Sequence, residues 1–113
     1  MPEILLHYIW QQRLWADMPQ ATTDNQPVEI LSVGQHNRDA GPDFSHARVR
    51  IGTHEWVGNV EMHVRASDWR RHRHHTNPAY DNVVLHVVCE ADEATYNTRG
   101  ECIPQCVLRY PHN

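Results

Sequence analysis

The chain has 113 residues, of which 40% are hydrophobic and 21% charged, and this balance predicts one folded domain, residues 1–113, rather than a disordered chain. The formal net charge of −4 excludes a protein that is basic overall, so any contact with nucleic acid or an anionic membrane must be local. All ten Lys and Arg positions are arginine, which excludes mechanisms that depend on a lysine ammonium group.

The N-terminal segment does not resemble a secretory signal, because Glu3 and His7 interrupt its apolar residues and no basic residues precede them. No apolar run approaches the length of a membrane span, so we expect no membrane association. The cysteines are odd in number and too few for a disulfide framework: Cys89, Cys102 and Cys106. We therefore expect reduced thiols and a cytoplasmic location.

An amphipathic helix is predicted over about residues 3–17, where four apolar side chains recur at helical spacing and Pro19 stops further propagation. These side chains are Leu6, Ile9, Trp10 and Leu14. A first strand is predicted over residues 28–33 and ends at Gly34. The loop that follows is rich in Asn, Asp, Gly and Pro up to Asp43, a composition that is typical of functional loops.

A hairpin of two strands is predicted next, with a first strand around residues 47–51, a turn at Gly52 and a return strand over about residues 55–65. One face of the return strand is predicted to be core and carries Trp56, Gly58, Val60, Met62 and Val64. The other face carries Val57, Asn59, Glu61, His63 and Arg65. The return strand therefore combines a packing face with a chemically reactive face.

A short helix is predicted over about residues 68–75, followed by a strand covered on both faces over residues 83–88. A later short strand near residues 103–108 is predicted to lie at an edge. The order is helix, strand, two-stranded hairpin, helix and strand. It predicts an α/β fold with a small mixed β-sheet flanked by helices.

Two carboxylates and a histidine are predicted to converge at the end of the hairpin. Glu61 and His63 leave the same strand face about 7 Å apart, and Asp43 stands just before the start of the partner strand. Asp43 shares its strand parity with the core residue Ala47, so we expect a bulge or a later strand start within residues 44–46 to re-aim it. Two converging acids suit Mg²⁺ or Mn²⁺, because hard cations take oxygen ligands and relieve the repulsion between the acids.

These motifs resemble the core of the PD-(D/E)XK phosphodiesterases. Their order along the chain is Gly41-Pro42-Asp43, a strand hairpin, Glu61-Met62-His63, a helix and an apolar strand. The resemblance implies an αβββαβ restriction-endonuclease-like core in which Asp43 and Glu61 bind the metal ion. His63 occupies the position of the lysine that, in this superfamily, helps to position or activate the attacking water.

Nearly the whole chain also resembles a bacterial family of unknown function. The segments that carry this resemblance are His7-Tyr8-Ile9-Trp10, Asn37-Arg38-Asp39-Ala40-Gly41-Pro42-Asp43-Phe44, Trp56-Val57-Gly58-Asn59-Val60-Glu61, Ser67-Asp68-Trp69 and Pro78-Ala79-Tyr80-Asp81-Asn82. This resemblance implies no established activity. Members of the family are often longer, so we expect either a shortened member or the N-terminal part of a longer architecture.

The residues around the acidic pair suggest further roles. A neutral His63 is suited to act as a general base or a metal ligand, and Arg65 on the same face is suited to stabilise developing phosphate charge. A basic run on the next helix, predicted to contact a DNA or RNA backbone, consists of Arg70, Arg71 and Arg73. A solvated helix face is the alternative interpretation of that run. His86 is expected to be a hydrogen-bonded core residue.

Two functions are compatible with these residues. The first is a metal-dependent phosphodiesterase, a nuclease-like hydrolase that acts on nucleic acid with Mg²⁺ or Mn²⁺, and the intact acidic pair favours it. The second is a catalytically inactive nuclease-like module with a binding or structural role. The absence of lysine and the acidic net charge favour this second function.

Overall fold

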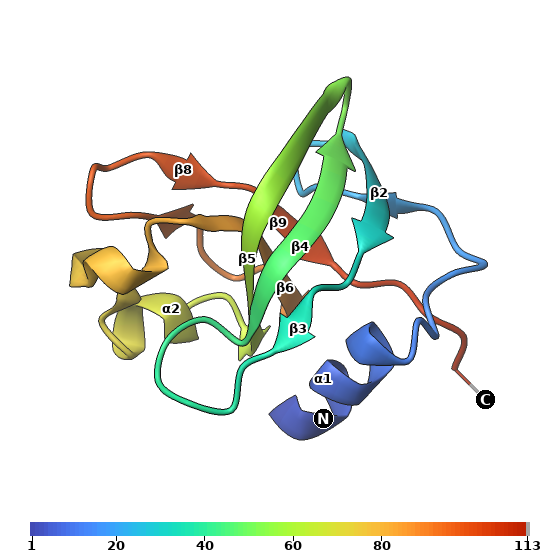
Figure 1. Cartoon of the computed structure of the whole chain (residues 1–113), viewed down its shortest axis with the longest axis horizontal. Coiled ribbons are helices and arrows are strands. Elements are labelled where there is room, and N and C mark those ends of the chain that lie inside the picture. The colour runs from blue at the N-terminus through green and yellow to red at the C-terminus, as the bar shows by residue number, and fades with distance from the viewer. Residues whose placement is uncertain (113) are drawn as a thin grey trace.

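One mixed sheet organises the protein, whose residues 1–112 are described by a computed structural model (Figure 1). The helices are α1 (Glu3–Gln11) and α2 (Asp68–Arg71), followed by two short 3₁₀ helices, η1 (His74–Thr76) and η2 (Pro78–Tyr80). The strands are β1 (Gln20–Ala21), β2 (Pro27–Ser32), β3 (Gln35–His36), β4 (Phe44–Ile51), β5 (His54–Arg65), β6 (Val83–Glu90), β7 (Thr95–Tyr96), β8 (Cys102–Ile103) and β9 (Gln105–Val107). None of the helices within residues 1–112 is long and apolar enough to cross a membrane.

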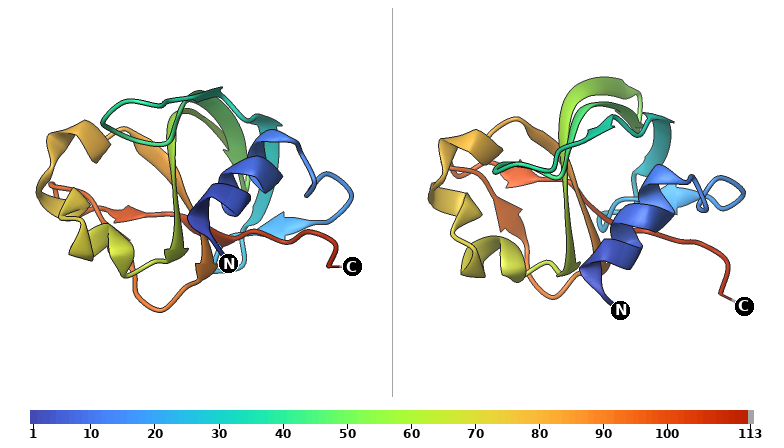
Figure 2. Two further views of the ribbon diagram at one scale, coloured as in Figure 1. Left: turned by 90° about the horizontal axis from the view of Figure 1, so that it is seen from below. Right: turned by 60° about the horizontal axis from the view of Figure 1, so that its bottom comes forward.

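The main sheet is nearly closed on itself. Its strand order is β1-β2-β4-β5-β6-β9, with β3 paired to β4. Neighbours are antiparallel from β1 to β5, whereas β5, β6 and β9 run parallel. An isolated bridge between Thr22 and Cys106 joins the two outer ends, and the amide of Thr23 donates to the carbonyl of Gln105 at 3.0 Å. The sheet therefore curls into a barrel-like shape (Figure 2).

The main hydrophobic core fills the inner side of this sheet. Val60 and Met62 of β5 are fully buried there, together with Leu85 and Val87 of β6. Helix α1 covers the same side and inserts the fully buried Trp10, whose indole Nε1 donates to the carbonyl of Val33 at 3.0 Å. Burying large apolar side chains of this kind stabilises the fold by about 1.5–3 kcal/mol each.

A second, smaller cluster lies on the outer face of β5 and β6, under α2, the two 3₁₀ helices and the β7–β8 hairpin. Figure 2 shows these elements on the side of the sheet away from α1. The apolar members of this cluster are Trp69, Tyr80, Val83 and Ile103. Because strand side chains alternate between faces, Glu61, His63 and His86 point into this outer cluster. The reactive strand face is therefore covered rather than open to solvent.

Helix α1 ends at Gln11 rather than near residue 17, so the predicted length was wrong. The amide of Leu14 reaches back to the carbonyl of Ile9 at 3.1 Å, and Arg13 between them has φ of 60°. This is the geometry of a Schellman end, in which glycine usually occupies the left-handed position. An arginine there leaves no sequence signal for the stop.

The helix predicted over residues 68–75 is split. Helix α2 ends at Arg71, Arg73 adopts a left-handed conformation with φ of 62°, and η1 begins at His74. Because the chain changes direction at Arg73, the histidines that follow do not continue the helical face. As a result of this break, His72 and His74 lie close to each other and to His63.

The bulge expected before the hairpin is confirmed. The pairing of β4 with β5 shifts register between Phe44 and Ala47, and His46 within the shift has φ of 59°. The shift lets Phe44 and Ala47 both reach the core although they are three positions apart. It also frees Asp43 from the strand parity that would have turned it inward.

The strand expected over residues 103–108 is interrupted at Pro104. Its second part, β9, pairs parallel with β6 and is the last strand in the order, as expected of an edge strand, while the bridge from Cys106 to Thr22 links it to the segment after β1. The coarser expectation of a mixed α/β fold with helices beside the sheet is confirmed. The fold is richer in strands, and more nearly closed, than the predicted order implied.

Candidate functional site

The carboxyl groups of Asp43 and Glu61 lie together where β4 begins beside β5. The Asp43 amide donates to Glu61 Oε1 at 3.1 Å, and the Met62 amide donates to Asp43 Oδ2 at 2.8 Å. These reciprocal contacts fix both acids through the backbone of the neighbouring strand.

Helix α1 adds two side chains on the solvent side of this pair. His7 Nε2 lies 3.4 Å from Asp43 Oδ2 and 3.7 Å from Glu3 Oε1. The other ring nitrogen of His7 lies 3.3 Å from His36 Nε2 in β3. Glu3, His7 and Asp43 each offer one ligand atom, and these atoms lie within 4.8 Å of one another. We call these three residues with Glu61 the carboxylate cluster.

Histidines surround the other oxygen of Glu61. Its Oε2 lies 3.3 Å from His63 Nε2 and 3.0 Å from His74 Nε2. The exposed His72 completes a group in which three imidazole nitrogens, from His63, His72 and His74, lie within 4.8 Å of one another. We call these three residues the histidine cluster. Glu61 therefore links the two clusters through its two oxygens.

A buried hydrogen-bonded chain supports His63 from behind. His63 Nδ1 lies 2.8 Å from His86 Nε2, and His86 Nδ1 lies 2.8 Å from the hydroxyl of Thr95. Gln105 Nε2 donates to the same hydroxyl at 2.7 Å. The expectation that His86 is a hydrogen-bonded core histidine is thus confirmed. This chain fixes the orientation of the His63 ring.

The residues of the carboxylate cluster differ in their protonation states. Burial and the neighbouring Asp43 carboxylate raise the pKa of Glu61 to about 10, so Glu61 keeps its proton at neutral pH. Burial alone would raise the pKa of Asp43, but the neighbouring His7 imidazole and a hydrogen bond from the Met62 amide outweigh it and hold this pKa below its usual value. The neighbouring carboxylates of Asp43 and Glu3, at 3.4 Å and 3.7 Å, raise the pKa of His7 to about 9. Asp43 and His7 thus form a charged pair beside a neutral Glu61.

The buried histidines are neutral at pH 7. Burial lowers the pKa of His63, and burial together with the neighbouring His63 lowers the pKa of His74 to about 4 and that of His86 to about 3. A neutral imidazole has a free lone pair on one nitrogen, which is the form that binds metal ions. His63 and His74 are therefore in a ligand-competent state at physiological pH.

A family model described as "Protein of unknown function (DUF2851)" matches residues 3–113. The chain belongs to this family. No curated protein and no solved structure matches the chain. Because the description of DUF2851 names no activity, the function of this member has to be argued from its site.

The four arginines assigned to phosphate binding lie outside both clusters of this DUF2851 member. Three of them form ion pairs: Arg65 with Glu90 at 3.3 Å, Arg70 with Glu93 at 3.0 Å and Arg71 with Asp68 at 4.0 Å. Arg73 is exposed between His72 and His74 and has no ion pair within residues 1–112. Among the four arginines, Arg73 is therefore the one that has no competing acidic partner within residues 1–112.

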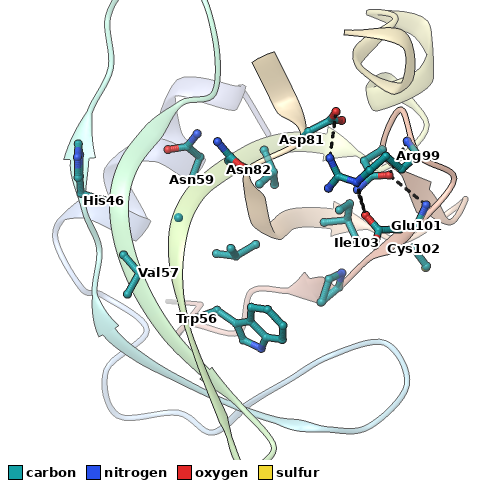
Figure 3. A pocket seen from close by; sticks show the side chains of 15 residues that line it. His46, Trp56, Val57, Asn59, Asp81, Asn82, Arg99, Glu101, Cys102 and Ile103 are labelled. Carbon is teal, nitrogen blue, oxygen red and sulfur yellow. Dashed lines mark hydrogen bonds and ion pairs between the residues drawn. The ribbon is translucent and has the colours of Figure 1, made fainter. Parts of the chain in front are cut away.

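A cleft of about 790 Å³ opens on the outer face of β5, before the acidic pair. Figure 3 shows Trp56 and Val57 on one side of it and Arg99 with Glu101 on the other. Asn59, in the same cleft, lies on the strand face that carries Glu61 two residues later. Trp56 is 50% exposed here, so its predicted place in the core was wrong. The cleft is lined by none of the residues of the two clusters.

The sequence predicted that Asp43, Glu61 and His63 lie together, but it did not place their neighbours Glu3, His7, His72 and His74 beside them. Glu3 and His7 stand four positions apart on α1, a spacing that puts them on one helix face but does not say which strand the face meets. His72 and His74 belong to a histidine-rich run, in which His72 and His75 have the helical spacing. The left-handed turn at Arg73 places His74, rather than His75, beside His63 and His72. No local sequence pattern predicts this turn.

Proposed function

We propose that the protein is a metal-dependent phosphodiesterase that acts on nucleic acid, with Asp43 and Glu61 as ligands of Mg²⁺ or Mn²⁺. The observation that carries the proposal is the interlocked position of the two carboxyl groups, each fixed by a backbone amide of the neighbouring strand. Their oxygens are donors of the kind that these hard cations prefer. A cation between them also relieves the repulsion that raises the pKa of Glu61.

A cation bound there would polarise a phosphoryl oxygen as a Lewis acid. Asp43, whose low pKa keeps it ionised, would be the first ligand, and Glu61 would join it on losing its proton. The protonated His7 sits beside Asp43, and its side chain is 15% exposed. We assign to His7 the transfer of a proton to the leaving oxygen, which is general acid catalysis.

His63, to which the sequence assigned water activation, has a different place in this proposal. Its side chain is only 1% exposed and contacts Glu61 Oε2 on the side away from α1. We therefore assign it the role of holding Glu61 in position. Arg65 stays a candidate for stabilising phosphate charge only if it leaves Glu90 when substrate binds.

The order of elements supports a relationship with the PD-(D/E)XK core. With the two-residue strands set aside, the chain runs α1, β2, β4, β5, α2, β6, which is the αβββαβ order that the resemblance implies. Glu61 lies on the third of these strands, and the strand after α2 pairs parallel with it. The closure of the sheet by β1 and β9 is an addition to that order.

Nucleic acid is the substrate class that the surroundings favour. The cleft before the acidic pair exposes the Trp56 ring, which is suited to stacking on a base, and Asn59 and Asn82 offer amide groups for base edges. Arg73 would contact the backbone phosphates, and Arg70 and Arg71 would do so after exchanging their present acidic partners.

A metal titration followed by a cleavage screen tests the proposal. Calorimetry should detect one Mg²⁺ or Mn²⁺ on the wild type and weaker binding to Asp43→Asn and Glu61→Gln, with cleavage of DNA or RNA reduced at least about 100-fold in both variants. Asp39→Asn is the matched control, because Asp39 is an exposed acid of the same loop. The proposal fails if the wild type binds neither ion, or if the variants bind as well as it does.

A catalytically inactive nuclease-like module is the second candidate. The 4% exposure of Glu61 favours it, because substrate then has to reach the metal from the Asp43 and His7 side alone. The ion pairs that occupy Arg65, Arg70 and Arg71 favour it as well. Metal binding without cleavage of any DNA or RNA, together with binding of nucleic acid, would support this candidate.

A further inference from the structure

We propose that the histidine cluster is a second metal site, in which His63, His72, His74 and Glu61 bind a transition-metal dication of the Zn²⁺ or Co²⁺ type. The site is distinct from the carboxylate cluster and does not depend on the proposed phosphodiesterase activity. The two sites share one residue, Glu61, which turns Oε1 towards Asp43 and Oε2 towards the histidines.

The spacing of the donor atoms fits a tetrahedral ion. Bonds of about 2.0–2.1 Å place two ligands of a tetrahedron about 3.3 Å apart. Glu61 Oε2 lies 3.3 Å from His63 Nε2 and 3.0 Å from His74 Nε2, so the carboxylate oxygen already stands close to this distance from two imidazole donors. The fourth, from His72, lies within 4.8 Å of the other two nitrogens. Because His72 is exposed, a small movement of its ring completes the set.

Two of the ligands are held in place before any ion binds. The chain through His86, Thr95 and Gln105 fixes the His63 ring from its far side. In the required tautomer, His63 Nδ1–H donates to His86 Nε2, which leaves His63 Nε2 free to bind the ion. Metal-binding histidines commonly have such an outer partner, which orients the ring and raises its basicity.

The His74 ring is fixed by aromatic packing. It stacks on the Tyr80 ring at 3.7 Å between centroids, with the planes 15° apart, and meets the edge of Trp69 at 5.4 Å. Two immobile ligands and one exposed ligand make a site that an ion enters from the His72 side. An ordinary buried histidine needs one hydrogen-bonding partner, whereas this arrangement directs two imidazoles at one carboxylate oxygen and places a third imidazole within 4.8 Å of both rings' nitrogens.

The donor set selects the class of ion. Three imidazole nitrogens and one carboxylate oxygen suit borderline dications such as Zn²⁺ and Co²⁺, whereas Mg²⁺ and Ca²⁺ prefer oxygen ligands throughout. The carboxylate cluster, which has one imidazole and three acids, suits the harder ions. Glu61 could then bridge two ions, since a shared carboxylate commonly joins metals about 3.5–4 Å apart.

Co²⁺ absorption provides the test, because tetrahedral Co²⁺ has strong visible bands that do not require activity. The metal-free wild type titrated with Co²⁺ should develop these bands at one equivalent, and Zn²⁺ should bleach them. His72→Ala should weaken Co²⁺ binding at least 10-fold without loss of fold, because His72 is exposed. His74→Ala should do the same, and circular dichroism confirms that each variant is folded. His54→Ala is the matched control, because this histidine is exposed at the β4–β5 turn.

The proposal is overturned if the wild type develops no visible bands, or if His72→Ala and His74→Ala both keep them with unchanged affinity. Asp43→Asn separates this site from the proposed function. Under both proposals, this variant loses Mg²⁺-supported cleavage and keeps the Co²⁺ bands. Cleavage without bands would reject the histidine site alone, and bands without any cleavage would reject the phosphodiesterase alone.

Discussion

Glu61 is placed in surroundings that disfavour its ionised form. Its carboxyl group is buried, faces the ionised Asp43 and has neutral imidazoles on its other side. At a pH above its ordinary pKa, Glu61 ionises in the unfolded chain but stays protonated in the fold, and this difference lowers the free energy of unfolding. Natural proteins keep such residues at functional sites, where stability is exchanged for activity.

Glu61→Gln should therefore stabilise the metal-free protein at pH 8. The pKa of Glu61 is about 10 when folded and 4.5 ordinarily, so the folded state holds an extra proton between these values and stability falls as pH rises through that window. A glutamine side chain does not ionise, so Glu61→Gln removes this pH-dependent loss of stability. Urea unfolding with a chelator present should show a gain of about 1–3 kcal/mol at pH 8 and much less at pH 5.

Glu29→Gln serves as the control for this change, because Glu29 is exposed on β2 and should shift stability little at either pH. A loss of stability in Glu61→Gln at pH 8 would show that the carboxylate is ionised in the metal-free fold. That result would remove the electrostatic argument for a functional Glu61.

His74 gives the opposite pH dependence. Its pKa is about 4 in the fold and 6.5 ordinarily, so the unfolded chain takes up a proton first as the pH falls. Its influence on stability is therefore full above pH 6.5 and is lost progressively towards pH 4. His74→Phe, which keeps the stacking on Tyr80, should give a shallower fall of unfolding free energy between pH 6.5 and 4. An unchanged slope in urea titrations would contradict this.

At the scale of elements, the end of α1 offers a simple test of backbone strain. Arg13 occupies a left-handed position that glycine adopts without cost. Arg13→Gly should therefore raise the free energy of unfolding by about 0.5–1 kcal/mol, and Arg13→Ala should give no such gain because it keeps the Cβ. Thermal unfolding of both variants measures the difference. A lower melting temperature for the glycine variant would show that the contact of Arg13 with the Trp15 ring matters more than the strain.

The sequence predicted those elements whose signals are local. The alternation on β5 correctly placed Val60 and Met62 inside and Glu61 and His63 outside, and the parity of Asp43 correctly required a bulge. The stops of α1 and α2 were missed, because left-handed arginines replaced the usual glycines. The meeting of α1 with the acidic pair was not predictable either, since it depends on packing between distant elements.

For the whole molecule, the closure of the sheet could not be read from the sequence, because it joins segments near the two ends of the chain. The bridge from Thr22 to Cys106 is one link, and the side chain of Gln20 is another. Gln20 Nε2 donates to the Arg109 carbonyl at 2.8 Å, and the Arg109 amide donates to Gln20 Oε1 at 2.9 Å. One buried side chain thus satisfies both backbone groups of a residue near the other end.

Gln20→Leu should open this closure. The change removes two part-buried hydrogen bonds to the backbone of Arg109, each of which should cost about 0.5–1.5 kcal/mol. Hydrogen exchange should accelerate in β9 and in the segment that follows it, while β4 and β5 stay protected. Gln12→Leu, at an exposed position after α1, should leave both measurements unchanged. Equal protection of β9 in both variants would show that the closure does not depend on Gln20.

The packing of Trp69 against the histidines gives the protein an optical property. Its indole ring lies 5.4 Å from the His74 ring and 5.1 Å from the His86 ring, and its Nε1 donates to the Tyr96 carbonyl. Excited indole loses energy readily to a neighbouring imidazole once that ring becomes positively charged. The intrinsic fluorescence of the unlabelled protein should therefore dim as the outer cluster takes up protons, so the emission of Trp69 follows the charge state of these buried rings.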